Sequence, residues 1–338
     1  MSYIKFENII KNFGNVNVLK NINLEIEKGE LVTLLGPSGC GKSTLLRCLA
    51  GLEPVTSGNI FLDGKNITNE SPKKREIGMV FQQYSLFPNM TIEQNVAFGL
   101  KIKKIPAEQQ KEQIDEIMDI VGLSEKRKSY PDELSGGQQQ RAALARAIVT
   151  KPKVLLLDEP LSAIDAKLRR SLQIEIRRIQ KELDITAIFV THDQEEAMVM
   201  SDTIHLLYQG NIEQSDTPSN LYVKPETRFA ASFIGHYNLF SAMEFQELVK
   251  KEIMAKDIAF RPEVVCLHKE PPVEDDTYVF SGKIRDCMSH GNTLRYAFDC
   301  HGKKVDVDTL FTSKKEWNTG DSCFLSIRQN DCILFGTE

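Results

Sequence analysis

The sequence predicts an α/β fold over residues 1–235 and a smaller all-β domain after it. Apolar runs at residues 31–35, 154–157 and 187–190 each end in polar residues, which is typical of buried parallel strands whose carboxyl ends open on a site. Helical stretches alternate with these runs, as in a sheet covered by helices. Residues 167–183 carry apolar residues at helical spacing with Arg and Lys on the other face, so we expect an amphipathic surface helix there.

After residue 235 the pattern of the sequence changes. Pro262 and Pro271 interrupt the chain, and short alternating segments such as residues 303–307 replace the helical patterns. Such alternation is typical of strands with one buried face. We therefore expect a domain boundary near residue 235, with residues 236–338 forming the all-β domain.

The composition excludes several classes of protein. The 338 residues are 41% hydrophobic and 26% charged, which is typical of a globular protein with room for more than one core. No run approaches the roughly 18 apolar residues of a membrane-spanning helix, and charges near the start disfavour a signal peptide. A formal charge of −5 and a pI near 5.8 disfavour a general nucleic-acid binder. The seven cysteines form no C-x-x-C pair, so we expect a reducing compartment and neither a disulfide framework nor a zinc site.

The strongest local signal lies at residues 36–44, which read GPSGCGKST and fit the pattern G-x-x-x-x-G-K-[ST]. The motif lies between an apolar strand and a helix-like stretch. In that context its glycines let successive N–H groups face a phosphate, and the helix adds its positive end. Lys42 offers a compact charge to the β- and γ-phosphates of a nucleotide, and Ser43 is placed to ligate Mg²⁺. The residues expected to contact the nucleotide here are Ser38, Gly39, Cys40, Gly41, Lys42, Ser43 and Thr44.

The second half of a nucleotide site follows the apolar run at residues 154–157, where Asp158 and Glu159 are adjacent. Adjacent carboxylates at the end of a buried strand cost solvation free energy unless a cation is present. We expect Asp158 to hold Mg²⁺ through its hydration shell and Glu159 to take a proton from an attacking water.

A second glycine-containing turn precedes this strand, with the sequence LSGGQ at residues 134–138 and a helical stretch at residues 142–148. A turn of this kind that leads into a helix is a second candidate anion site. One phosphate chain cannot easily occupy both cradles in a single copy of the chain, so the pattern indicates a site shared between subunits. Its candidate nucleotide-binding residues are Ser135, Gly136, Gly137 and Gln138.

With these motifs the chain resembles the ATP-binding-cassette ATPases, and among them the importer subunits for maltose, polyamines, ferric iron and phosphonates. The resemblance covers nearly the whole chain. It implies that Gln82 senses Mg²⁺ and the attacking water, that His192 contacts the γ-phosphate, and that Phe13 stacks on adenine. Gln83 is adjacent to Gln82, so the choice of Gln82 depends on the resemblance. Residues 162–165 match a loop between protomers, with Ile164 where the family usually has Leu.

The resemblance also implies an architecture and a set of partners. It implies a P-loop NTPase cassette with a helical subdomain at about residues 87–150, followed by a small OB-like barrel of the TOBE type. The expected catalytic residues are Glu159, His192 and Gln82, and the expected Mg²⁺ ligands are Ser43, Gln82 and Asp158.

ATP and Mg²⁺ are the expected cofactors, bound at a head-to-tail homodimer interface on the cytoplasmic face of the cell membrane. The expected partners are integral-membrane permease subunits, one helix of which inserts near residues 82–88, and an extracytoplasmic solute-binding protein, with no nucleic acid. Polyamine, ferric iron, aminoalkylphosphonate, sulfate-like anion and sugar remain open as solutes.

Two other functions compete with this interpretation. A soluble cassette ATPase that acts on nucleic acid or ribosomes usually has two cassettes or a long coiled-coil insert, and residues 45–133 show no sustained heptad. An exporter motor would lack the β-rich tail. We expect the basic clusters at residues 73–75 and 101–104 to be solvated surface.

Overall fold

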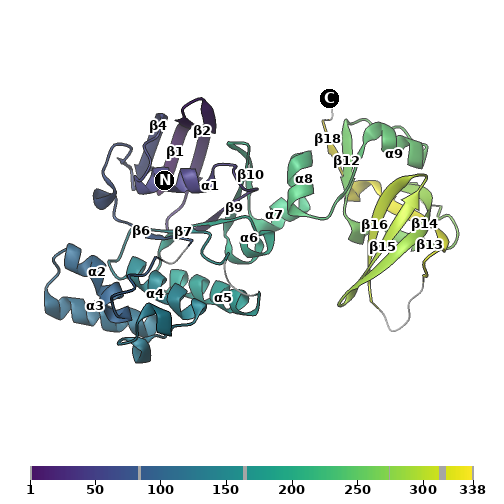
Figure 1. Cartoon of the computed structure of the whole chain (residues 1–338). Helices are drawn as coiled ribbons and strands as arrows, with labels where there is room; N and C mark the ends of the chain where they lie inside the picture. Colours follow the sequence, from purple (N-terminus) through teal and green to yellow (C-terminus); the bar gives the residue numbers. More distant parts are fainter. Residues whose placement is uncertain (1, 83–84, 163–165, 274, 312–316, 337–338) are drawn as a thin grey trace. The chain divides into compact units, whose positions relative to one another are not determined.

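The computed structural model divides the chain into two compact units, residues 1–219 and 220–338 (Figure 1). It describes residues 2–82, 85–162, 166–273, 275–311 and 317–336. The boundary that the sequence predicts near residue 235 stays a prediction, and it falls inside the second unit.

A six-stranded sheet in the order β10-β9-β3-β8-β7-β6 forms the centre of the first unit. The five strands from β9 to β6 are parallel, and β10 runs antiparallel along the edge. Three of these strands are the apolar runs that the sequence predicts, and all three are buried on both faces. The strands are β3 (Leu31–Leu35), β6 (Ile77–Val80), β7 (Val154–Asp158), β8 (Thr186–Thr191), β9 (Thr203–Tyr208) and β10 (Asn211–Asp216).

A second, antiparallel sheet in the order β2-β1-β4-β5 also belongs to the first unit, and the sequence did not predict it. Its strands are β1 (Ile4–Phe13), β2 (Val16–Ile26), β4 (Ser57–Leu62) and β5 (Lys65–Asn66). The helices of this unit are α1 (Lys42–Ala50), α2 (Ile92–Ile102), α3 (Ala107–Ile120), α4 (Gly136–Ile148), α5 (Ala166–Glu182) and α6 (Gln194–Met200).

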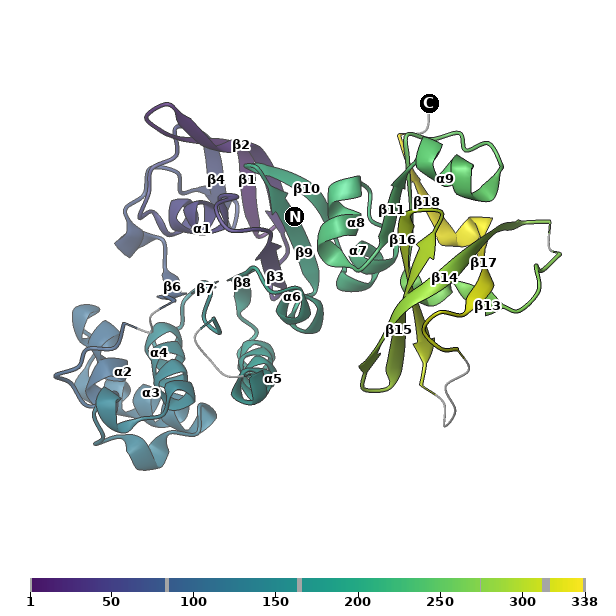
Figure 2. The ribbon, with the colours of Figure 1, turned by 45° about the vertical axis from the view of Figure 1, so that its right-hand side comes forward.

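The central sheet separates two hydrophobic cores. Alternate residues of β7 belong to different cores, because successive side chains of a strand point to opposite faces: Leu156 packs with α1 and the antiparallel sheet, and Leu155 packs with the helices of the other face. In Figures 1 and 2, α1 lies between the two sheets and α2 to α5 lie beyond the central sheet. Each fully buried leucine contributes about 1.5–3 kcal/mol to the free energy of unfolding, so both faces hold the strand ends in place.

Helix α5 confirms the predicted amphipathic pattern, since Leu172, Ile176 and Ile179 are buried against the central sheet and its neighbouring helices. Helices α2, α3 and α4 fall inside the range expected for a helical subdomain. Asn95 of α2 is fully buried and fixes the chain before that helix: its Nδ2 donates to the carbonyl of Phe87 at 3.1 Å, and its Oδ1 accepts from the N–H of the same residue at 2.8 Å.

Arg75 corrects one prediction, since it is 4% exposed rather than part of a solvated basic cluster. Lys73 and Lys74 are exposed, as expected. The Arg75 guanidinium donates to the carbonyls of Cys48 and Leu49, both at 2.8 Å, at the end of α1. It also donates to two carbonyls of the preceding loop, so several of its N–H groups are satisfied by backbone that the sequence pattern does not reveal.

The second unit is built on antiparallel sheets, as expected, in the orders β11-β12-β18 and β13-β17-β14-β15-β16. Phe245 lies at the centre of its core, with aromatic contacts to Phe240, Phe260, Tyr278 and Phe280. The sequence did not predict the helices α8 (Arg228–Ile234) and α9 (Ala242–Val249). The strands are β11 (Asn238–Ser241), β12 (Asp257–Phe260), β13 (Cys266–His268), β14 (Thr277–His290), β15 (Thr293–Cys300), β16 (Lys303–Leu310), β17 (Ser322–Arg328) and β18 (Cys332–Phe335).

One further helix, α7 (Pro218–Val223), spans the division between the units. No helix in the described part of the chain is long and apolar enough to cross a membrane.

A buried histidine joins the last two strands of the central sheet. His205 of β9 lies opposite Ser215 of β10, and its Nδ1 is 2.7 Å from the Ser215 hydroxyl. Its Nε2 is buried with no hydrogen-bond partner in the described structure. Burial lowers the pKa of His205 to about 4, because the charged imidazolium would be desolvated.

We therefore expect acid to weaken this unit. The pKa of His205 is about 4 in the fold and about 6.5 in the unfolded chain, so the unfolded state binds more protons as pH falls below about 6.5. The contribution of neutral His205 to the free energy of unfolding is fully present above about pH 6.5, and about 2 kcal/mol of it is lost by pH 5. The measurement is the free energy of unfolding in urea at pH 7 and pH 5, for wild type and His205→Gln. An equal loss in both proteins would contradict the assignment to His205.

Candidate functional site

The loop between β3 and α1 forms a cradle that only glycine permits at two positions. Gly41, the residue before α1, has a φ of 106°, and a Cβ there would lie 2.7 Å from Leu19 Cδ2. A Cβ on Gly36 would lie 2.2 Å from the carbonyl oxygen of Leu207. Both contacts are closer than real Cβ atoms make, so the loop keeps its path only with glycine at these places. This course of the loop directs the N-terminus of α1 toward the space in front of the loop.

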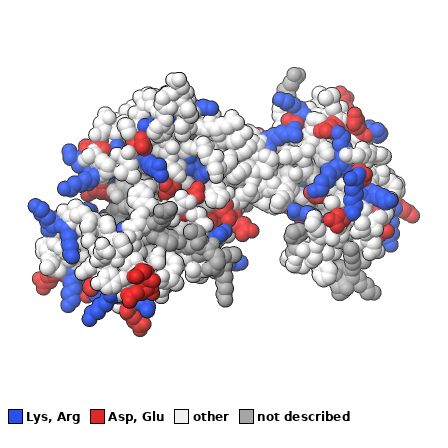
Figure 3. Space-filling model, in the orientation of Figure 1, with Lys and Arg blue, Asp and Glu red and all other residues white. Residues whose placement is uncertain are grey.

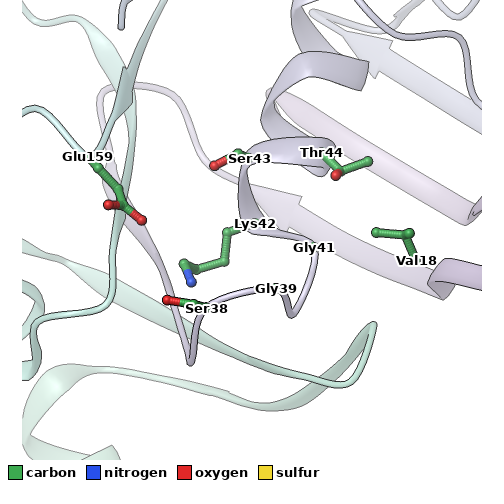
Figure 4. Close-up of a pocket in the computed structure, with 8 residues that line it drawn as sticks. All are labelled: Val18, Ser38, Gly39, Gly41, Lys42, Ser43, Thr44 and Glu159. Carbon is green, nitrogen blue, oxygen red and sulfur yellow. The ribbon is translucent and has the colours of Figure 1, made fainter. Parts of the chain in front are cut away.

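A cavity of about 310 Å³ opens in front of this cradle (Figure 4). In Figure 4 the Glu159 carboxylate faces the loop side chains Lys42 and Ser43 from a separate segment of the chain. The volume is at the lower end of the range for small-molecule sites. The lining combines the predicted phosphate residues with one carboxylate and one apolar side chain: Val18, Ser38, Gly39, Gly41, Lys42, Ser43, Thr44 and Glu159.

Lys42 is buried and bound to its own loop. Its Nζ donates to the carbonyls of Gly36 at 2.7 Å and Pro37 at 2.9 Å, which holds a positive charge within the cradle. Cys40 differs from the other predicted contacts, because its side chain is buried and is not part of the cavity lining. Burial raises the pKa of the Cys40 thiol, so it stays protonated at neutral pH.

Ser43 and Asp158 come together as the sequence predicts. The Ser43 hydroxyl donates to Asp158 Oδ1 at 2.7 Å, and Asp158 is 5% exposed. Within the described ranges no cation of the protein pairs with this carboxylate. A buried carboxylate next to a hydroxyl is an oxygen donor set that suits Mg²⁺, and a bound cation would offset the cost of burying the charge.

Glu159 is the meeting point of the predicted catalytic side chains. Gln82 Nε2 donates to Glu159 Oε2 at 3.5 Å, and His192 Nδ1 lies 3.4 Å from the same oxygen. Gln82 also donates to the Ser162 hydroxyl at 3.4 Å. The other residues of the predicted inter-protomer loop, 163–165, lie outside the described residues.

The backbone of Glu159 is held in a conformation that glutamate rarely adopts. Its φ is 45°, and its N–H donates to the carbonyl of Val190 in the neighbouring strand at 3.1 Å. Left-handed backbone at a residue other than glycine costs about 1–3 kcal/mol and persists only where the surroundings impose it. The strained backbone therefore lowers the stability of the fold, and it places the Glu159 carboxylate in the cavity lining.

Phe13 lies at the end of β1, opposite Val16 on a hairpin whose second strand provides Val18 to the cavity lining. Its ring is 46% exposed, and Lys11 Nζ covers one face at 4.5 Å from the ring centroid. Lys11 is held there by the carbonyl of Pro54 at 2.8 Å. The geometry leaves ring surface for stacking, although Phe13 is not itself part of the described lining.

The structure does not bring residues 135–138 to the cavity, since none of them belongs to its described lining. They begin α4 with a capping box in which the Ser135 hydroxyl accepts from the N–H of Gln138, and Gln138 Oε1 accepts from the N–H of Ser135 at 2.9 Å. Ser135 and Gly136 are exposed, and a Cβ on Gly136 would meet nothing within 4 Å. This turn is an open helix N-terminus on a separate part of the unit.

Sequence reasoning missed the residues behind His192. Arg169, Thr191, Asp193 and Glu196 line a small cavity of about 40 Å³ together with Glu159, Ser162 and His192. Arg169 lies on the basic face predicted for this helix, and it is half-buried and pairs with Asp193 and Glu196. The three carboxylates that follow His192 at residues 193–196 were the available signal, and two of them pair with Arg169.

Comparisons with known proteins agree with this geometry. Residues 19–162 match the family described as ABC transporter. The chain is 54% identical over 239 residues to the Fe(3+) ions import ATP-binding protein FbpC of Vibrio cholerae serotype O1, which covers 71% of this chain and 68% of that protein. It is 44% identical over 333 residues to the spermidine/putrescine import ATP-binding protein PotA of Bacillus thuringiensis, which covers 97% of both.

A solved structure shows the same fold. It is cbiO1 from Clostridium perfringens, described as part of the ABC transporter complex cbiONQ. The TM-score is 0.62 at 31% sequence identity, over 66% of this chain and 91% of that chain.

Proposed function

The chain belongs to the family of ATP-binding subunits of ABC transporters, and we propose that two copies bind ATP between them in a head-to-tail arrangement. It is the ATP-hydrolysing subunit of an importer and works with a membrane permease. We also propose a site composed of residues from both copies, a role for Mg²⁺, a place for each partner and a class of solute.

One observation carries the composite site: the predicted nucleotide-binding residues occupy two separate places in one chain. The loop cradle and Glu159 line the cavity, whereas residues 135–138 form a helix N-terminus that does not line it and that exposes Ser135 and Gly136. An exposed helix N-terminus with a bare glycine favours a phosphate. A second copy, rotated head to tail, would bring its own turn to the γ-phosphate held by the first.

The chemistry proposed for each side chain follows from its place. Ser43 and Asp158 would hold Mg²⁺, which when bound neutralises charge on the β- and γ-phosphates. Lys42 supplies a fixed positive charge inside the cradle. Glu159 accepts a proton from the attacking water, and its carboxylate is held by Gln82 and lies beside His192.

ATP binding and hydrolysis then drive a change between two states. Two ATP molecules enclosed by complementary surfaces hold a pair of chains closed, and loss of the γ-phosphate removes contacts that bridge them. The pair reopens because the two states differ in their contacts to that phosphate. The closing and reopening of the pair would in turn drive a conformational change in the permease.

We place the permease contact on the segment that follows β6. Phe81 is exposed there, and Phe87 lies against Phe98 with a ring centroid distance of 4.5 Å. Two hydrogen bonds between Asn95 and the backbone of Phe87 hold the end of this segment in place, which suits it to receive a helix. The subunit would lie on the cytoplasmic face of the membrane, and an extracytoplasmic solute-binding protein would act through the permease.

Charge supports a protein partner rather than nucleic acid. Figure 3 shows Lys and Arg interspersed with Asp and Glu on the face that it presents. In residues 240–338 there are 13 Lys and Arg against 17 Asp and Glu, whereas a nucleic-acid footprint needs clustered cations.

Replacing Glu159 by Gln tests the proposed chemistry. The amide keeps the size of the side chain but cannot accept the proton, so we expect turnover to fall by about 10²–10⁴-fold while ATP still binds and holds a closed dimer. The measurements are steady-state hydrolysis and size-exclusion chromatography with ATP. Glu195→Gln is the control, since Glu195 is exposed in the first turn of α6. Turnover by Glu159→Gln at the control rate would show that another group is the base.

For the solute we propose a polyamine as the first candidate, with ferric iron and aminoalkylphosphonate as the alternatives. The alignment with PotA of Bacillus thuringiensis extends through both units, whereas that with FbpC of Vibrio cholerae covers less of the chain.

The solute is tested on vesicles that carry the complete importer with its binding protein. We expect spermidine or putrescine to raise ATP hydrolysis several-fold over the solute-free rate. Vesicles with the Glu159→Gln subunit are the control and should not respond. If only ferric iron or only an aminoalkylphosphonate raised ATP hydrolysis, that solute would take the place of the polyamine in the proposal.

A further inference from the structure

An ion-pair network lies directly behind His192 and joins it to a different helix. Arg169, in the first turn of α5, donates from Nη1 to Asp193 Oδ2 at 3.1 Å. Its Nε lies 3.7 Å from Glu196 Oε1, within ion-pair distance. One guanidinium thus contacts two of the three carboxylates that follow His192 at residues 193–196.

Both residues that flank His192 are fixed by this network. Before it, the Thr191 hydroxyl donates to Glu196 Oε2 at 2.6 Å and accepts from the N–H of Asp193 at 3.0 Å. After it, Asp193 Oδ1 accepts from the N–H of Glu195 at 2.8 Å and so caps α6, while its other oxygen binds Arg169. The backbone on either side of the imidazole is therefore held.

The ion-pair network is buried at Glu196 and half-buried at Arg169. Glu196 is 4% exposed, and the side chain of Arg169 is 30% exposed. Burial raises the pKa of the Glu196 carboxyl, and the Thr191 hydroxyl and Arg169 act against that rise. A half-buried guanidinium between two carboxylates is a rigid link, because its planar fork can contact both at once.

His192, by contrast, is not held through its own ring. Its side chain is 53% exposed, and the described interaction of its ring is the approach of Nδ1 to Glu159 Oε2 at 3.4 Å. The position of the imidazole therefore depends on the backbone that carries it, and that backbone depends on the two carboxylates and the hydroxyl around it.

We propose that Arg169 is a positioning residue for hydrolysis, which holds the turn at the end of β8 so that His192 stays beside Glu159. This inference rests on the role of His192 in the proposed function. In the described part of the chain, Arg169 does not line the cavity at the phosphate loop, and its ion pairs are with Asp193 and Glu196. Its loss should therefore lower the rate of the chemical step and leave ATP affinity unchanged.

The test compares Arg169→Met with Arg170→Met, a substitution of the exposed neighbour on the same helix. A displacement of about 1 Å in a catalytic group costs about 10²-fold, so we expect kcat to fall by ~10–100-fold in Arg169→Met, with KM and the dissociation constant for ATP unchanged. Arg169→Lys should recover part of the rate, because one ammonium can pair with one of the two carboxylates. Arg170→Met should behave as wild type.

A double-mutant cycle shows whether Arg169 acts through His192. In the His192→Ala background, Arg169→Met should lower single-turnover hydrolysis by less than about twofold, because the group that it positions is already gone. Asp193→Asn is a second variant that keeps the helix cap and loses the ion pair, and it should repeat the loss of kcat without a change in melting temperature.

The outcomes separate the two claims. Multiplicative losses in the cycle, or a rise in the ATP dissociation constant with unchanged kcat, would overturn the positioning role of Arg169 while leaving His192 its function. Full turnover by His192→Ala would instead overturn the role of His192 in the proposed function, and the inference with it.

Discussion

Four neighbouring parallel strands end at one edge of the central sheet, and that shared edge is the constraint on which the site depends. In the order β3-β8-β7-β6, the strands lead into the phosphate loop, His192, the Asp158–Glu159 pair and the segment of Gln82. The two hydrophobic cores fix the strands from both faces. The packing of the strands therefore brings the four polar segments together, and contacts between these segments are not needed to assemble them. The strained backbone of Glu159 is tolerated because this packing imposes it.

The same arrangement underlies our proposal that one chain holds only part of the site. The sheet edge collects the residues that we propose for the phosphates, the metal and the water. The LSGGQ turn instead begins a helix outside the described cavity lining, with Ser135 and Gly136 exposed and Gly137 buried. The turn presents a capped helix N-terminus to solvent, which is a surface suited to an anion brought by another molecule. In the proposed dimer, subunit association and catalysis depend on the same geometry.

Much of this could be predicted from local patterns. The buried strands, α5 and the phosphate loop carry their own signals, because uninterrupted apolar runs, helical spacing and glycines at fixed places act over a few residues. The antiparallel sheet was missed although β1 and β2 are long, because register shifts between them interrupt the strict alternation of buried side chains. The short helices α8 and α9 were missed because short helices depend on tertiary packing more than on local preference. The roles of the individual site residues stay predictions.

The error on Arg75 and the unpredicted ion pairs of Arg169 share a physical cause. Arg75 and Arg169 lie in basic stretches that resemble solvated surface, and composition cannot show that distant groups will receive their N–H donors. Backbone carbonyls at the end of α1 accept hydrogen bonds from Arg75, and Arg169 pairs with carboxylates next to β8. Only the folded chain brings these partners within reach.

The central claim is that a catalytic pocket needs walls from two copies of the polypeptide. It is tested most directly by measuring ATP turnover per chain over a dilution series, with the association state followed under the same conditions. The account expects turnover per chain to fall toward zero as the fraction of paired chains falls. Undiminished turnover from chains that are demonstrably single would contradict it.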